Sequence, residues 1–159
     1  MHPASAQETE NKALIRRWLE EVWNAGRIEL VDELRAPDSV STGLVERDSE
    51  SRGNAPFVVF YNNLRQAFPD LQVRIEDMLA EGDKVAVRAT FEGTHMGDAF
   101  GVSATGRRIN VVCIAIARVE GGKIVQGWNS LDQLGILHQI GALSTGKGAA
   151  GFFAGRPGA

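Results

Sequence analysis

The stretch that decides the fold is RINVVCIAIARVEGGKIVQGWNSLD, which runs from Arg108 to Asp132. It contains two runs of strand length, rich in valine and isoleucine, separated by the glycine-rich turn EGGK at residues 120–123. Two similar runs precede it, LQVRIEDML at residues 71–79 and KVAVRATFEG at residues 84–93. Four strands joined by turns, without helical spacers, predict an antiparallel sheet.

The residues before these strands have helical periodicity. In SAQETENKALIRRWLEEVWNAG, residues 5–26, apolar pairs recur every four positions and form a wide stripe on a helix. Ser5 and Glu8 have the spacing of a capping box, and Gly26 supplies a stop. A first amphipathic helix is therefore expected.

Two further helices are expected before the sheet. A short one should cover Ile28 to Leu34 and end before the next proline, because a residue that precedes proline disfavours the helical conformation. Another is predicted within NAPFVVFYNNLRQAFPD, residues 54–70, where Asn54 can act as the cap. The intervening DSVSTGLVERDSESRG, residues 38–53, is interpreted as a polar loop.

Three helices, four strands and a short closing helix predict an α+β fold, with the helices over the concave face of a curved antiparallel sheet and a pocket between them. The chain has 159 residues, 43% of them hydrophobic, which suits one domain with one core. We assign residues 10–143 to this domain, residues 1–9 to a flexible N-terminus and the Gly/Ala-rich residues 144–159 to a mobile tail.

Composition limits the classes of partner and cofactor. The formal net charge is -3 and the 17 basic residues are scattered, so no nucleic-acid-binding surface is indicated. No apolar run reaches the roughly 18 residues of a membrane span, and no signal peptide is evident. The single cysteine, Cys113, excludes an internal disulfide and fits a reducing cytoplasm. No metal-ligand spacing or phosphate-binding loop is found, so we expect no metal and no cofactor.

Several strings also resemble a known family. They are FPDLQVRIEDMLAEGDKVAVRATFEGTHMG at residues 68–97, TGRRI at residues 105–109 and GGKIVQGWNSLDQLGILHQIG at residues 121–141. They are similar to the SnoaL-like polyketide cyclases, or ester cyclases, which belong to the nuclear-transport-factor-2-like superfamily with its cystatin-like α+β cone. The resemblance implies closure of a ring in a polyketide ester by intramolecular aldol condensation, without cofactor, with an aspartate as general acid/base.

The resemblance places that aspartate on Asp132, just before LGILHQIG. Asp132 follows Trp128 by four positions on a strand, so both side chains should face one side, where neutral neighbours would raise the pKa of the carboxyl group. Asp132 could also serve only as a helix cap. His95, in GTHMG, resembles another element of the family and either assists proton transfer or shapes a turn.

The predicted substrate pocket is lined by apolar and aromatic side chains. Its expected members are Trp128, Trp18, Tyr61, Phe60, Asn110, Val112, Ile114 and Arg118. The ligand should be a hydrophobic aromatic or polyketide-like small molecule. The other face of the same strand, represented by Ile109 and Cys113, is expected to point outward and to pack against a second copy in a homodimer.

Three functions stay open. The first is the cyclase. The second is an isomerase or epoxide hydrolase on the same fold, although the alternating acid and arginine pattern of such hydrolases is missing around Arg88 and the only tyrosine is Tyr61. The third is a non-catalytic small-molecule binding module, since one fold can serve many functions. The chain also lacks the Glu-His pair that family members often have before the tryptophan, and has Gln126 and Gly127 there.

Overall fold

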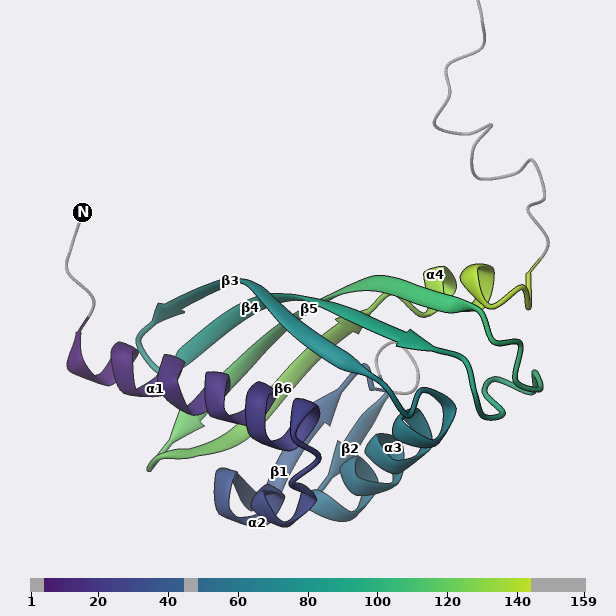
Figure 1. Cartoon of the computed structure of the whole chain (residues 1–159). Helices are drawn as coiled ribbons and strands as arrows, with labels where there is room; N and C mark the ends of the chain where they lie inside the picture. Colours follow the sequence, from purple (N-terminus) through teal and green to yellow (C-terminus); the bar gives the residue numbers. More distant parts are fainter. Residues whose placement is uncertain (1–4, 45–48, 144–159) are drawn as a thin grey trace, which may run out of the picture.

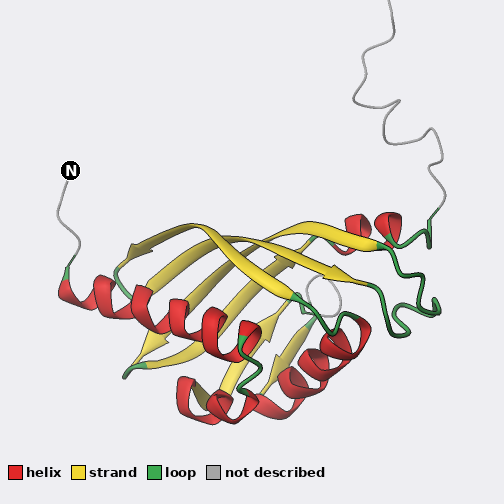
Figure 2. Cartoon of the chain, viewed as in Figure 1, coloured by secondary structure: helices red, strands yellow, loops and turns green. Residues whose placement is uncertain are grey.

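The computed structural model describes residues 5–44 and 49–143 (Figure 1, Figure 2). The helical segments are α1 (Ala6–Arg17), the π-helical turn η1 (Trp18–Asn24), the 3-10 turn η2 (Ile28–Leu30), α2 (Val31–Leu34), α3 (Asn54–Ala67) and α4 (Gln133–Gln139). The strands are β1 (Arg35–Thr42), β2 (Glu50–Arg52), β3 (Gln72–Glu81), β4 (Lys84–Thr94), β5 (Arg108–Glu120) and β6 (Lys123–Leu131). The tail predicted at residues 144–159 lies outside the described residues.

The six strands form one mixed sheet in the order β2-β1-β6-β5-β4-β3. Strands β3 to β6 pair antiparallel with one another in chain order, which confirms the four strands predicted from the sequence. Strand β1 pairs antiparallel with β2 and parallel with β6. The polar loop predicted at residues 38–53 is wrong, because most of β1 and all of β2 lie within it. The buried side chains of β1 include two serines, Ser39 and Ser41, and a polar sequence of this kind does not indicate a buried strand.

The sheet curves around α1, α2 and α3, which lie together on its concave side, while α4 lies beside the far ends of the strands (Figure 1, Figure 2). The aromatic core between the layers centres on Trp23. Its ring centroid lies 5.1 Å from that of Tyr61 on α3 and 5.6 Å from that of Phe91 on β4. Packing of aromatic rings at such distances fixes the helices on the sheet.

The ends of two helices test the predicted caps. The capping box of α1 is confirmed, since Ser5 Oγ accepts the Glu8 backbone N–H and the Glu8 carboxylate accepts the Ser5 N–H. Helix α1 therefore includes residues 6–9, which had been assigned to a flexible N-terminus. The cap predicted for α3 is wrong: the N-cap position is occupied by Gly53, and the Asn54 side chain forms other hydrogen bonds.

The face of β5 that contacts the helices is the opposite of the predicted one. Ile109 and Cys113 are buried on the concave side, with 1% and 9% of their surface exposed. Val112 and Ile114 are 43% and 53% exposed on the outer face. Both faces of this strand are apolar, so the sequence pattern did not distinguish them. The face of Ile109 and Cys113, which was predicted to form an outward dimer surface, is therefore directed into the core.

Candidate functional site

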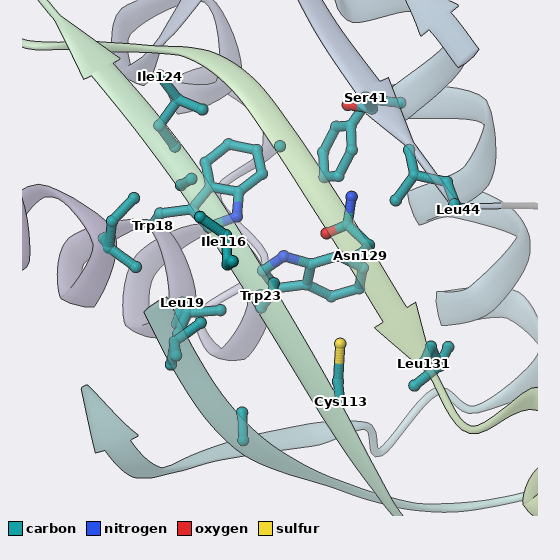
Figure 3. A pocket seen from close by; sticks show the side chains of 18 of the residues that line it. Trp18, Leu19, Trp23, Ser41, Leu44, Cys113, Ile116, Ile124, Asn129 and Leu131 are labelled. Carbon is teal, nitrogen blue, oxygen red and sulfur yellow. The ribbon is translucent and has the colours of Figure 1, made fainter. Parts of the chain in front are cut away.

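A cavity of about 90 Å³, here called the chamber, lies between the concave face of the sheet and the helices (Figure 3). A larger cavity of about 580 Å³, here called the mouth, shares Leu44, Phe60 and Leu131 with it. The walls of the chamber are mainly aromatic and aliphatic, and include Ile15, Trp18, Leu19, Trp23, Phe57, Val87, Phe91, Cys113, Ala115 and Ile124. Chamber and mouth are adjacent at these three residues, and concave, mostly apolar cavities of this kind are typical of small-molecule sites.

The chamber exists because small residues of the sheet face large residues of the helices. Strands β5 and β6 contribute the small residues Cys113, Ala115 and Gly127 to its wall. The helical segment η1 contributes the large residues Trp18 and Trp23. Short side chains opposite rigid indole rings leave a volume that neither layer fills. The site is therefore a consequence of residue size along two strands.

Arg35 is the only cation among the described residues that line the chamber and the mouth. It begins β1 and is only 4% exposed. Its Nε donates to Asn54 Oδ1 at 3.1 Å and its Nη2 donates to Ser41 Oγ at 3.0 Å. The guanidinium carbon lies 4.9 Å from the Phe57 ring centroid. Burial lowers the pKa of Arg35 to about 10, so the group remains cationic at neutral pH.

Asn129 and Cys113 are further polar groups of the chamber. Asn129 Nδ2 donates to the Thr42 carbonyl at 3.0 Å, and Figure 3 shows its carbonyl oxygen directed toward Trp23. Burial raises the pKa of the Cys113 thiol to about 11, which keeps it protonated near neutral pH. The sequence pattern placed Cys113 on the outer face of the sheet and indicated no role for Asn129.

Asp98 is the only carboxylate among the described residues that line the chamber and the mouth. It lies on the loop between β4 and β5, and its side chain is exposed at the mouth. The same loop is held on α3 by backbone hydrogen bonds from Met96 and Gly97 to the Ala67 carbonyl. No group of three potential metal ligands occurs in residues 5–44 and 49–143.

Asp132 lies outside the chamber. Its Oδ1 accepts the Gly135 backbone N–H at 2.8 Å, so it caps α4. Trp128 shares the outer face of β6 with it, and both line a separate outer hollow of about 810 Å³ together with Val112 and Ile114. The predicted common direction of Trp128 and Asp132 is confirmed, but the prediction that helix aromatics line the same pocket is wrong.

The other predicted site residues divide between the chamber and the rest of the fold. Trp18 and Phe60 line the chamber. Tyr61 is buried in the core, where its hydroxyl donates to the Val22 carbonyl at 2.9 Å. Asn110 and Arg118 do not line the chamber, because both belong to the outward face of β5.

His95 is completely buried and lines neither the chamber nor the mouth. Its Nδ1 accepts the Thr105 backbone N–H at 3.3 Å and lies 3.0 Å from Thr105 Oγ1. Its backbone also exchanges hydrogen bonds with Gly106 and Arg107. These contacts close the base of the loop between β4 and β5, and this arrangement matches the turn-shaping alternative left open for His95.

Four residues of the site were not predicted from the sequence, namely Arg35, Ser41, Asn129 and Asp98. Arg35 and Ser41 were missed because no strand was predicted at β1: the short helix was expected to end at Leu34, and residues 38–53 were interpreted as a polar loop. Asn129 was missed because the wrong face of β6 was assigned to the pocket. The inner face of β6 consists of the alternate residues Gly127, Asn129 and Leu131. Apart from the amide of Asn129 these side chains are small or apolar, and this is the signal in the sequence that identifies the inner face.

An aromatic chamber under a curved sheet defines a small α+β protein built around a ligand pocket. The family model described as SnoaL-like polyketide cyclase matches residues 13–140. The chain belongs to this family. None of the helices in the described parts of the chain is long and apolar enough to cross a membrane.

Similar proteins agree with this assignment. Two proteins named aklanonic acid methyl ester cyclase, from Streptomyces sp. (strain C5) and Streptomyces peucetius, are each 31% identical over 130 residues. These residues cover 80% of this chain in both cases, and 80% and 88% of the two relatives. Among solved structures, a SnoaL-like protein of Jannaschia sp. CCS1 is 25% identical with a TM-score of 0.82, covering 91% of this chain and 100% of that one. TsrD from Streptomyces laurentii is 28% identical with a TM-score of 0.75, over 89% of this chain and 100% of that one.

Proposed function

We propose that this protein binds a polyketide-like carbonyl compound in the chamber and mouth and closes a ring in it by intramolecular aldol-type chemistry. The observation that carries the proposal is the aromatic chamber, which adjoins the mouth at Leu44, Phe60 and Leu131 in a chain of the SnoaL-like polyketide cyclase family. Planar aromatic walls suit a flat conjugated ligand, and the volume of the mouth is within the range of small-molecule sites.

Ring closure needs a folded substrate and a stabilised enolate. A chamber with rigid walls holds the two reacting carbons close together, and this removes much of the entropic cost of the reaction. Asn129 places a carbonyl oxygen in the chamber, which accepts a hydrogen bond from an enol or hydroxyl of the ligand. A C–H flanked by two carbonyls is acidic, so a modest base removes its proton.

The proton acceptor in this proposal is Asp98. Its carboxylate lines the mouth, beside Phe60 and Leu131, where a ligand leaves the chamber. The assignment of general acid/base to Asp132 remains a prediction from the sequence. The position of Asp132 on the outer face of β6, where it caps α4, argues against that assignment.

The direct test uses aklanonic acid methyl ester, the compound in the names of the two relatives. Aldol closure gives an isomer of unchanged mass, so chromatography with mass detection separates substrate from product. Formation of such an isomer, faster than in buffer alone, supports the cyclase. Binding without conversion favours the binding module, and conversion without a new ring favours the isomerase. Lack of both binding and conversion contradicts the proposed ligand class.

We also propose that the protein forms a homodimer through the outer face of the sheet. Val112, Ile114 and Ile116 are 43%, 53% and 40% exposed in a row on β5, and Trp128 on β6 adjoins them. Such a contiguous apolar surface is unusual for a monomer. Light scattering should give the mass of a dimer, and Ile114→Lys should give a monomer with an unchanged circular dichroism spectrum. A monomeric wild-type protein at micromolar concentration contradicts this proposal.

A further inference from the structure

The charge of Arg35 is not balanced by the described protein. Arg35 forms no ion pair with a described carboxylate, and its two side-chain hydrogen bonds go to the neutral groups of Asn54 and Ser41. Asp32 is linked to Asn54 by a hydrogen bond of 2.9 Å from Asn54 Nδ2, and so contacts the guanidinium only through that amide. A buried cation without a partner is costly, so its retention in a cavity points to a negative charge supplied by a ligand.

The aromatic contacts of Arg35 orient it without neutralising it. The guanidinium carbon lies 4.9 Å from the Phe57 ring centroid and 5.7 Å from that of Trp18. These cation–π contacts hold the planar group against two rings of the chamber wall that also contact each other, with their centroids 4.9 Å apart. The Nη1 donors have no acceptor among the described residues, and Arg35 itself lines the chamber. A planar guanidinium fixed in this way is suited to an oxygen anion.

The chamber also offers other unused donors. The indole nitrogens of Trp18 and Trp23 form no hydrogen bond with any described residue. Figure 3 shows both tryptophans and Asn129 among the side chains that line the chamber. Indole nitrogen only donates, so the free hydrogen-bonding capacity of the site is mostly that of donors. A ligand that satisfies these donors presents several oxygen acceptors.

Arg35 lies at the inner end of the site. It is paired with Ile124 at the start of β6. Leu44 and Leu131, which border the mouth, lie at the opposite ends of these two strands, since Leu44 follows β1 and Leu131 is the last residue of β6. A ligand that reaches Arg35 must therefore enter with its acidic end first and leave its apolar body toward the mouth.

We propose that Arg35 binds an oxygen anion of the ligand, either a carboxylate or an enolate or phenolate, at the inner end of the chamber. This inference rests on the proposed function, because it assumes that the chamber holds a polyketide-like compound. It adds that the compound is recognised as an anion and defines which end enters first.

The first experiment compares anthraquinone-2-carboxylate with anthraquinone-2-carboxamide, which have nearly the same shape and differ in charge. Binding is followed by quenching of tryptophan fluorescence, since Trp18 and Trp23 line the chamber. The wild-type protein should bind the carboxylate at least tenfold more tightly, and the variant Arg35→Met should bind both compounds equally. Arg88→Met, which removes an arginine paired with Asp77 on the sheet surface, is the control and should keep the preference.

The second experiment needs no variant and covers the phenolate. An apolar pocket alone raises the pKa of a bound phenol, whereas a nearby guanidinium lowers it. Visible absorption of 2-hydroxyanthraquinone bound to the wild-type protein should therefore show a phenol pKa at least one unit below that of the free compound. This readout remains decisive if Arg35→Met does not fold.

The outcomes separate this inference from the proposed function. Equal binding of carboxylate and carboxamide by the wild-type protein, with an unchanged or raised phenol pKa, overturns the role of Arg35 and leaves the chamber as a site for neutral polyketide-like ligands. If folded Arg35→Met still binds the carboxylate more tightly than the carboxamide, the proposed role of Arg35 is also overturned. Failure of all three anthraquinones to bind overturns this inference together with the proposed ligand class.

Discussion

Two substitutions of Asp132 distinguish a helix cap from a catalytic acid. Asp132 Oδ1 accepts the Gly135 N–H at 2.8 Å, and α4 has only 7 residues, of which Ile136 is buried with 1% exposure. Loss of a cap by an alanine substitution costs about 0.5–2 kcal/mol, whereas asparagine is nearly as good a cap as aspartate. We therefore expect Asp132→Ala to lower the free energy of unfolding by about 1 kcal/mol and Asp132→Asn to change it little.

The same variants should keep the cyclisation rate, because the carboxylate lies on the outer face of β6, away from the chamber. Urea unfolding measures stability, and conversion of aklanonic acid methyl ester measures activity. Asp98→Asn is the matched variant at the mouth, and should lower the rate about 10²-fold or more if Asp98 accepts the proton, with little change in stability. Loss of activity in Asp132→Asn with unchanged stability, while Asp98→Asn remains active, would refute the separation of Asp132 from the site.

Further expected outcomes concern the thiol and the loop at the mouth. Because burial raises the pKa of Cys113 from 9.0 to about 11, the protonated thiol stabilises the folded state below pH 9.0, and this stability is lost as the pH rises toward about 11. The loss should be about 2–3 kcal/mol and absent in Cys113→Ala, as measured by urea unfolding of both proteins across this range. A Cβ at Gly97 would lie 2.2 Å from the Gln66 carbonyl oxygen, so Gly97→Ala should cost about 1–3 kcal/mol and weaken anthraquinone binding at the mouth. An unchanged melting temperature in Gly97→Ala would contradict the close contact between this loop and α3.

The elements with strong periodicity could be predicted from the sequence, and those with mixed polarity could not. Strands β3 to β6 follow valine- and isoleucine-rich runs, and α1 starts at a capping box, so local chemistry defined them. Strand β1 contains Pro37 within an irregular pairing with β6, and it buries Ser39 and Ser41, of which Ser41 accepts a hydrogen bond from the buried Arg35. The strand that pairs with β1 in parallel is distant in sequence, and no local pattern indicates it.

The polar groups of the site depend on which face of β6 points inward, that is, on whether its odd-numbered or its even-numbered residues line the chamber. In WNSLD, residues 128–132, the tryptophan and the aspartate are four positions apart and therefore share a face, but Asn129 lies on the other. A shift of one residue in the assigned face replaces a carboxylate by an amide as the polar group of the pocket. Hydrophobicity could not settle the choice, because β5 is apolar on both sides. Side-chain size settles it, since Cys113 and Ala115 leave room for the tryptophans of the helical layer where Val112 and Ile114 would not. The chamber and its amide follow from that single choice of face.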